Sequence, residues 1–248
     1  MKIGIIGIGS IGGTLARKLS SAGHEIRVAN SKGVDDVRPF ADEVGATAAD
    51  TRGAISGADL VIMSIPLPAL EKLPKDLFKD VAESVPVVDT SNYYPGMRDP
   101  RIADLDAGEV ESVWVSKQIG RPVIKAFNNI LAETLAKLGK PEGAAGRLAV
   151  AVAGDDAAAK QVVMGIVNEV GFDPVDAGAL AESWRQQPST PAYCCDYDAA
   201  TMRKALGAAV KGEAPKKRDQ LPDKMGTLGS NPTHAHMVAM NRSLNPLT

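Results

Sequence analysis

Short apolar segments alternate with amphipathic ones along the first 176 residues. Apolar runs rich in Ile and Val predict buried strands at residues 2–8, 25–29, 46–48, 59–65, 85–89, 122–127, 147–153 and 172–175. Helical spacing of the apolar residues between them predicts helices at 11–22, 34–44, 70–82, 109–118, 129–138 and in a segment that Asp155 begins and Gly171 ends. This alternation predicts an α/β fold, with helices on both faces of a mostly parallel, doubly wound sheet.

The pattern changes after Gly178. Helices are expected near residues 179–187 and 197–210, with no strand between them. Residues 211–224 are charged and contain prolines, which indicates a linker or exposed loop. Residues 230–248 form a polar, Met-containing tail that is either disordered or packed on the body or on a second subunit. The expected organisation is a sheet domain at 1–176, a smaller, mainly helical lobe at 177–210, and a charged linker and tail at 211–248.

A glycine pattern follows the first predicted strand directly. Residues 7–12, GIGSIG, match G-x-G-x-x-G between an apolar strand and an amphipathic helix, which is the context of a Rossmann dinucleotide-binding loop. Gly7 would allow the tight turn, Gly9 the approach of a pyrophosphate, and Gly12 close packing of helix on strand. The amides of Ser10 and Ile11 would face the phosphates. A turn that serves packing alone is the alternative.

The end of the second predicted strand indicates which dinucleotide binds. Residues 28–33, VANSKG, lie about 20 residues after the glycine loop, where an acid would contact the ribose 2′-hydroxyl of NAD. Asn30 and Ser31 can instead donate hydrogen bonds, and Lys32 supplies a positive charge. We therefore expect NADP(H) as the cofactor, with Arg38 as a further candidate contact. An exposed polar turn that binds nothing is the alternative.

Polar residues also follow three other predicted strands. Because an open parallel sheet binds ligands beyond the carboxyl ends of its strands, these residues are candidates to position the nicotinamide. They are Ser64, Ile65 and Pro66, then Asn92 within SNYY, and finally Asn128, Asn129 and Ile130. Each segment could equally be a turn that ends a strand.

No catalytic acid or base can be assigned from the sequence. The Tyr-x-x-x-Lys pattern of short-chain dehydrogenases is absent, and His24, His234 and His236 are expected at the surface. Lys125 is the one plausible ammonium donor, although a strand lysine that reaches solvent or an ion pair is the better interpretation. A carbonyl reductase needs a positioned acid, whereas a flavin-like acceptor depends mainly on orientation. The missing acid therefore favours a flavin or deazaflavin acceptor.

Composition excludes several other classes of function. The formal net charge is -2 and aromatic residues make up 4%, so neither a nucleic-acid surface nor a base-stacking platform is indicated. We expect no membrane span, no secretion signal and no metal site, and hence a cytoplasmic protein. Cys194 and Cys195 are adjacent, and a disulfide between neighbours is strained, so two reduced thiols are expected.

The motifs together resemble a known family, the NADP oxidoreductases that use the deazaflavin coenzyme F-420. The likeness covers residues 2–175 and rests on KIGIIGIGSIGGTLARKLSSAGHEIRVANSKG, DTSNYYPGMRDPRI, VIKAFNNI and AVAGDD. It implies that Ser31 and Lys32 hold the 2′-phosphate and that residues 128–132 form the nicotinamide region. It also implies NADPH as cofactor and coenzyme F-420 or FMN as the small-molecule co-substrate.

The chain departs from the family's minimal members at its C-terminal end. The linker and tail are additional, and the acceptor pocket lies in the less similar part, where ESWRQQPSTPAY is the most distinctive stretch. Trp184, Pro191 and Tyr193 would line that pocket or pack in the core. Two alternatives stay open, an NADPH-dependent imine or carbonyl reductase and a non-catalytic NADPH sensor. A homo-oligomer, most simply a dimer, is expected.

Overall fold

A six-stranded parallel sheet forms the centre of the protein. The computed structural model describes residues 1–247. The strands are β1 (Lys2–Ile6), β2 (Glu25–Ala29), β3 (Thr47–Ala48), β4 (Leu60–Met63), β5 (Val87–Asp89) and β6 (Ile124–Lys125). Their order, β3-β2-β1-β4-β5-β6, is that of a doubly wound dinucleotide-binding fold, so the predicted fold class is confirmed. The order of the strands along the chain reverses between β1 and β4, and open sheets of this kind bind dinucleotides beyond the carboxyl ends of the strands at that point.

The last two predicted strands form a separate parallel pair. β7 (Ala149–Val152) pairs with β8 (Asp173–Asp176), and an isolated antiparallel bridge from Lys125 to Ala153 connects this pair to β6. The sheet as a whole is therefore mostly parallel, with one antiparallel contact at the edge.

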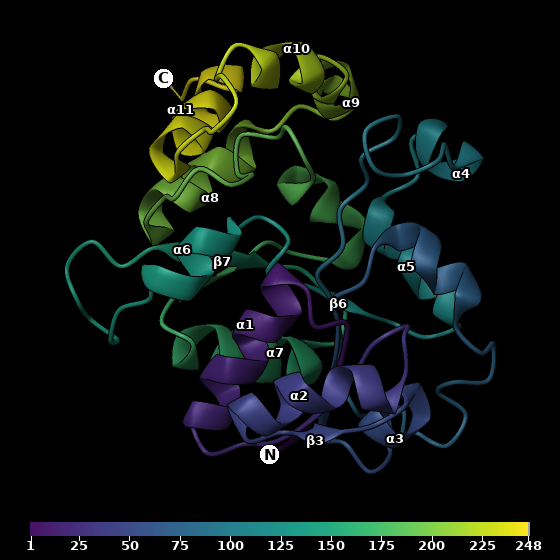
Figure 1. The fold of residues 1–248 in the computed structure, drawn as a ribbon. Helices are drawn as coiled ribbons and strands as arrows, with labels where there is room; N and C mark the ends of the chain where they lie inside the picture. The colour runs from purple at the N-terminus through teal and green to yellow at the C-terminus, as the bar shows by residue number, and fades with distance from the viewer. Residues whose placement is uncertain (248) are drawn as a thin grey trace.

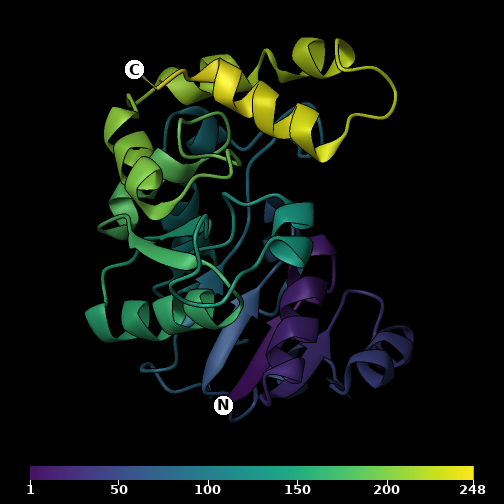
Figure 2. The ribbon, with the colours of Figure 1, turned by 90° about the vertical axis from the view of Figure 1, so that its left-hand side faces the viewer.

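Helices cover both faces of the sheet (Figures 1 and 2). One face packs against apolar residues of α1 (Ser10–Ser21), α2 (Val34–Val44), α6 (Ala132–Lys137) and α7 (Ala157–Glu169). The other packs against α3 (Thr51–Ile55), η1 (Leu67–Lys72), α4 (Ala103–Asp106) and α5 (Glu111–Ile119). Residues on one strand alternate between the two cores, since Ile3 and Ile5 face the first and Ile6 faces the second.

The C-terminal part is helical and lies beyond the carboxyl ends of the strands, in green to yellow in Figures 1 and 2. Its elements are η2 (Leu180–Gln186), α8 (Ala199–Ala208), α9 (Glu213–Arg218), α10 (Leu221–Gly226) and α11 (His234–Leu244). The helices predicted at 179–187 and 197–210 correspond to η2 and α8.

Three expectations about local structure were wrong. Residues 70–82 are not one helix: after the short 3-10 helix η1, Pro74 removes a backbone donor and turns follow. Residues 211–224 are not a loop, because they contain α9 and the first four residues of α10, and Pro222 lies in the first turn of α10, where proline fits a helix. Asp156, rather than Asp155, caps α7, and Asp155 instead accepts a hydrogen bond from the Leu180 amide at 2.9 Å.

The tail packs on the body of the protein up to residue 247. In α11, Arg242 donates to the backbone carbonyls of Cys195 and Asp196, at 2.8 and 2.9 Å. Asn241 and Asn245 donate to the carbonyls of Cys194 and Ser189. Of the three expected states, packing on the body is therefore the one observed.

Candidate functional site

The glycine loop has the geometry that its spacing predicts. Gly7 has φ +98°, and a Cβ there would lie 2.2 Å from the Ser64 carbonyl oxygen. A Cβ on Gly12 would lie 2.0 Å from the Gly7 oxygen. Both glycines are thus required by close packing of loop, helix and strand. Gly9 differs, because a Cβ there would meet nothing within 4 Å, so its outer side is free for a ligand.

The N-terminus of α1 faces the same open space. Gly9 is the N-cap and makes no side-chain cap, and the helix carries no acid in its first turn. The first amides of a helix have no partner inside the helix, so those of Ser10 and Ile11 are suited to an anion. Gly9 and Ser10 are exposed and Ile11 is half-buried. These residues fit the pyrophosphate of a dinucleotide.

The turn after β2 divides the three predicted phosphate contacts into two kinds. Asn30 uses its side chain within the turn, where Oδ1 accepts from the amides of Lys32 and Gly33 and Nδ2 donates to Asp36 at 2.7 Å. Ser31 and Lys32 are exposed. The Lys32 side chain is 75% exposed, and its Nζ lies 3.7 Å from the Asp36 carboxylate. Asn30 therefore shapes the turn, whereas Ser31 and Lys32 are accessible to a ligand.

The ends of β4 and β5 lie beside the loop. The Ser64 amide donates to the Ile6 carbonyl and the Thr90 amide to the Met63 carbonyl, so the strands end at a common edge. Ser64 and Ile65 are half-buried against the glycine loop, and Pro66 is exposed. This arrangement brings the predicted Ser64–Pro66 segment to the glycine loop as packing partner and rim.

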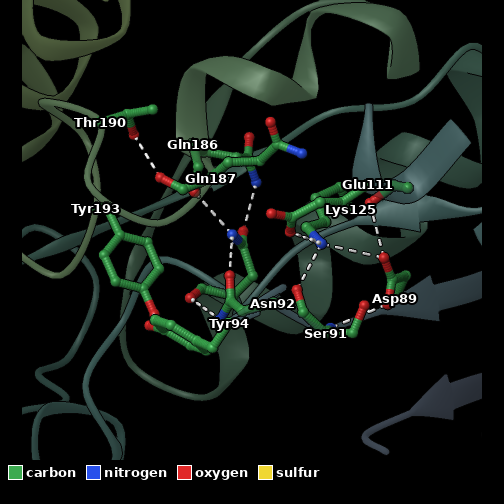
Figure 3. Close-up of polar contacts among 12 residues, drawn as sticks. Asp89, Ser91, Asn92, Tyr94, Glu111, Lys125, Gln186, Gln187, Thr190 and Tyr193 are labelled. Carbon is green, nitrogen blue, oxygen red and sulfur yellow. Dashed lines mark hydrogen bonds and ion pairs between the residues drawn. The ribbon is translucent and has the colours of Figure 1, made fainter. Parts of the chain in front are cut away.

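The predicted asparagines form a buried amide network at the ends of β5 and β6 (Figure 3). Asn92 and Asn128 are joined by Asn128 Nδ2 to Asn92 Oδ1, at 3.1 Å, and by Asn92 Nδ2 to the Asn128 carbonyl, at 2.9 Å. Gln186 of η2 donates to Asn128 Oδ1 at 2.9 Å, and Asn128 Nδ2 donates to the Gln186 carbonyl at 2.7 Å. Asn129 donates to the Ala192 carbonyl, and Ile130 is buried. The network fixes the C-terminal segment to the sheet.

The segment held by this network contains unusual backbone. Ser189, Cys194 and Asp196 have φ values between 51° and 68°, and Phe127, just before the asparagines, has φ 60°. Side chains other than glycine seldom adopt this left-handed conformation. Such residues persist where surrounding contacts determine them, and they concentrate at functional sites.

A buried charge cluster lies beneath the asparagines, and the sequence had not indicated it. Lys125 on β6 has a fully buried side chain whose Nζ donates to the Ser91 carbonyl at 2.6 Å and lies 3.1 Å from Asp89 on β5. Glu111 at the start of α5 lies 3.9 Å from the same Nζ (Figure 3). The sequence favoured a strand lysine that either reaches solvent or forms an ion pair, and Lys125 forms the ion pair. The signal available in the sequence was a lysine and an aspartate inside two otherwise apolar strands.

The two carboxyl groups of this cluster differ in acidity. Burial would raise the pKa of Asp89, but Lys125 and hydrogen bonds from Ser91 and Ser112 hold that pKa below its usual value. Burial raises the pKa of Glu111 to about 7. Lys125 lies farther from this carboxyl group than from Asp89, and Glu111 Oε2 has no hydrogen-bond partner among residues 1–247, so little offsets the effect of burial. A single ammonium group therefore neutralises Asp89 and leaves Glu111 undercompensated.

Two tyrosines and an arginine lie next to the network. The hydroxyls of Tyr94 and Tyr193 are hydrogen-bonded to each other (Figure 3), and burial raises the pKa of both phenols. Arg98 lies over the Tyr94 ring, 5.2 Å from its centre, and donates to the Asn92 carbonyl. Tyr193 therefore lies against Tyr94 beside the amide network, and Pro191 is buried two residues earlier in the same segment.

The cysteines and histidines have structural surroundings. Cys194 and Cys195 are buried free thiols, and burial raises the pKa of Cys195 to about 11. His234 is less exposed than expected, since its Nε2 lies 2.7 Å from Asp196. Residues 1–247 contain no group of three or more His, Cys, Asp or Glu placed to hold a metal ion. Over the same residues, no helix combines the length and apolarity that a membrane crossing requires.

The strand order and the geometry of the glycine loop define a class of protein, the Rossmann-type dinucleotide-binding proteins. Residues 2–93 match the family model of NADP oxidoreductases, coenzyme F420-dependent. The chain belongs to this family and is an NADP-dependent oxidoreductase.

Similar proteins cover more of the chain. Protein YjhV of Escherichia coli (strain K12) is 57% identical over 125 residues, which span 50% of this chain and 84% of that protein. The crystal structure of hypothetical protein SMa0349 from Sinorhizobium meliloti is 31% identical, with a TM-score of 0.62 over 75% of this chain and 89% of the other. A "putative f420 dependent nadp-reductase" from Arthrobacter sp. FB24 is 20% identical, with a TM-score of 0.57 over 92% of this chain and 94% of the other, and it shows the shared fold.

Proposed function

We propose that the protein transfers a hydride between NADPH and a flavin or deazaflavin of the coenzyme F-420 type. The observation that carries the cofactor half is the pairing of an open glycine loop with a turn at residues 30–33 in which Ser31 and Lys32 are accessible and no residue is acidic, although Asp36 of α2 lies beside it. A hydroxyl and an ammonium group there favour a 2′-phosphate over a free 2′-hydroxyl. Bound NADPH supplies the hydride.

The protein's own residues would have separate roles in this reaction. Gly9, Ser10 and Ile11 bind the pyrophosphate, and Ser31 and Lys32 bind the 2′-phosphate, while Asn30 shapes their turn. Gly7 and Gly12 hold the loop, and Ser64, Ile65 and Pro66 border the nicotinamide side. Asn92, Asn128, Asn129 and Ile130 hold the C-terminal segment that would face the acceptor.

The state of Lys125 supports the acceptor half. A carbonyl or imine acceptor takes up a proton together with the hydride, so its reductase needs a proton donor at the acceptor. Lys125, the donor that the sequence offered, is fully buried and bonded to Asp89 and Ser91. A deazaflavin ring needs mainly orientation, which a rigid amide network provides. The family description, coenzyme F420-dependent, points to the same acceptor.

Stopped-flow mixing tests the proposal. Protein loaded with NADPH is mixed separately with oxidised deazaflavin, FMN and small carbonyl or imine compounds, and the loss of reduced nicotinamide is followed by absorbance. We expect rapid single-turnover oxidation with the deazaflavin and none with the carbonyls. Oxidation by an imine or ketone, with none by either flavin, would contradict the proposal.

Variants at the β2 turn test the cofactor half separately. Lys32→Ala should weaken NADPH binding about fivefold, because an exposed charged contact contributes about 1 kcal/mol, and leave NADH binding unchanged. Lys204→Ala, an exposed lysine on α8, is the matched control and should change neither. Equal loss of NADH and NADPH affinity in Lys32→Ala would contradict 2′-phosphate recognition.

A further inference from the structure

A carboxylate lies against the turn that is proposed to bind the 2′-phosphate. Asp36, in the first turn of α2, accepts a hydrogen bond from Asn30 Nδ2 at 2.7 Å, and its other oxygen lies 3.7 Å from Lys32 Nζ. The two groups that Asp36 contacts are thus among the three that the sequence assigned to the phosphate. The Asp36 side chain is 41% exposed, so the protein does not shield its charge from a ligand bound at the turn.

The fold of the turn does not require this charge. Asn30 Oδ1 accepts from the amides of Lys32 and Gly33, at 2.9 and 3.1 Å, and these neutral hydrogen bonds form the turn. Asn30 Nδ2 needs an acceptor to fix its orientation, and a neutral oxygen would serve as well as a carboxylate. An acid in a first turn also interacts favourably with the helix dipole, but Asp35 occupies the same turn and provides this interaction too.

The charge of Asp36 is placed where it acts on an anionic ligand. A phosphate oxygen bonded to Lys32 Nζ lies about 2.8 Å from that nitrogen, and therefore within about 7 Å of the Asp36 carboxylate. In water, repulsion between two unit charges about 7 Å apart lowers a binding constant about threefold. A phosphate monoester carries about -1.5 to -2 charges at pH 7, which makes the expected reduction about fivefold.

The contact with Lys32 acts in the same direction. The ammonium group of Lys32 is already paired with Asp36 when the phosphate arrives, so the phosphate shares the lysine with the carboxylate or displaces it. Attraction between Lys32 and the phosphate is therefore partly offset by the attraction that Lys32 gives up. Both effects weaken the binding of a ligand with a 2′-phosphate, and neither acts on a ligand with a free 2′-hydroxyl.

We infer that Asp36 is a specificity-determining residue, whose charge weakens the binding of NADP(H) and so limits the preference for NADP(H) over NAD(H). The inference rests on the proposed contact of Ser31 and Lys32 with the 2′-phosphate. The oxidised and reduced cofactors carry the same phosphate, so the carboxylate weakens the binding of both equally. Its effect is faster exchange of the cofactor between turnovers.

Replacing Asp36 by Asn tests the charge. Asn keeps an oxygen that accepts from Asn30 Nδ2, and it removes the negative charge. Calorimetric titration at about 10 mM salt, where the Debye length is about 30 Å, should show NADPH bound about fivefold more tightly than by the parent and NADH bound equally. Adenosine 2′,5′-bisphosphate and adenosine 5′-phosphate, which lack the nicotinamide, should show the same difference. Asp36→Glu keeps the charge and should bind NADPH within about twofold of the parent.

A matched control and a salt series separate electrostatics from structure. Asp42 is exposed and lies six residues farther along α2, so Asp42→Asn removes the same charge from the same helix away from the turn, and should leave NADPH affinity unchanged. At about 1 M salt, where the Debye length is about 3 Å, the advantage of Asp36→Asn should disappear. Circular dichroism and thermal melting check that the variants are folded.

The outcomes distinguish this inference from the proposed cofactor site. If Lys32→Ala loses affinity for NADPH alone and Asp36→Asn gains none, the inference is overturned and the 2′-phosphate site stands. If neither variant changes the ratio of NADPH to NADH affinity, both are overturned. A gain in Asp36→Asn that NADH shares, that Asp42→Asn reproduces, or that persists at high salt would not come from repulsion of the 2′-phosphate, and would also overturn the inference.

Discussion

Replacing Lys125 by Met removes the cation of the buried charge cluster and leaves two carboxyl groups behind. The side chains of Lys125 and Asp89 are 0% and 2% exposed, and their charged atoms are 3.1 Å apart. In the variant, Asp89 keeps only the Ser112 hydroxyl and the Ser91 amide as partners. Breaking a buried ion pair by removing one partner costs about 3–5 kcal/mol, because an uncompensated charge stays in the interior. We expect this loss in the free energy of unfolding.

Urea and thermal unfolding measure the loss. For a chain of this size, 1 kcal/mol shifts Tm by about 2–4 °C, so Lys125→Met should melt about 6–20 °C lower than the parent. Without the ammonium group, the pKa of Asp89 rises above its unfolded value. An acid with a raised folded pKa contributes stability below its unfolded pKa and loses it as pH rises. The deficit should therefore be smaller at pH 5 than at pH 8.

A double variant separates the charge effect from the loss of packing. Asp89→Asn with Lys125→Met replaces the ion pair by a neutral amide and a thioether of similar size. It should be more stable than Lys125→Met alone by about 2 kcal/mol, since neutral replacements of buried pairs are often well tolerated. Two results would contradict the assigned ion pair between Lys125 and Asp89. One is a loss of less than about 1 kcal/mol in Lys125→Met. The other is a double variant that is less stable than both the parent and Lys125→Met.

The single variant Lys125→Met also tests whether Lys125 takes part in the reaction. If Lys125 donates a proton to a carbonyl or imine acceptor, the folded variant should bind NADPH and lose turnover. If the lysine is structural, as its contacts indicate, the folded variant should still oxidise NADPH with a deazaflavin. Activity is measured below the melting temperature of the variant, so that unfolding does not imitate loss of catalysis.

Further substitutions test other parts of the structure. Gly9→Ala should keep the parent's Tm, because its Cβ meets nothing within 4 Å, and should weaken NADPH binding about tenfold. Gly12→Ala should instead lower Tm, because its Cβ would lie 2.0 Å from the Gly7 oxygen. Calorimetric melting and ligand titration distinguish the two variants. Burial raises the pKa of Glu111 to about 7, so the contribution of this group to stability is complete below its ordinary pKa of 4.5 and is lost as pH rises through 7. The free energy of unfolding, measured from pH 4 to 8, should therefore fall in the parent and change less in Glu111→Gln. Cys194 and Cys195 are buried, so a thiol reagent should label them slowly in the native protein and rapidly in urea; fast native labelling would contradict their placement.

The sequence predicted the sheet well because its signals are local. An Ile-rich run before GIGSIG and glycines at fixed spacing determine β1, the loop and α1 within a few residues, and the structure confirms that Gly7 and Gly12 are sterically required. The helices at 213–218 and 221–226 were missed because prolines at 215 and 222 suggested breaks, whereas proline in a first turn is compatible with a helix.

The site was predicted only in part, because burial and partners are not local properties. Asn30 has the right residue type and position for a phosphate donor, yet its amide donates to Asp36, which lies six residues later in the first turn of α2. Asn128 was expected beside the nicotinamide, and its partner Gln186 lies 58 residues later in the chain. Glu111 was missed entirely, since a glutamate at the start of a helix ordinarily faces solvent.

The contacts of α11 have a consequence for how the protein is made. The carbonyl of Cys194 accepts from Asn241, a residue that is synthesised 47 positions later, and Arg242 holds the next two carbonyls. The carbonyls of residues 194–196 therefore lack these three donors until the final helix has emerged from the ribosome. A prematurely terminated chain that ends before residue 241 would leave these carbonyls to water, and two residues that adopt left-handed backbone, Cys194 and Asp196, would be held less firmly.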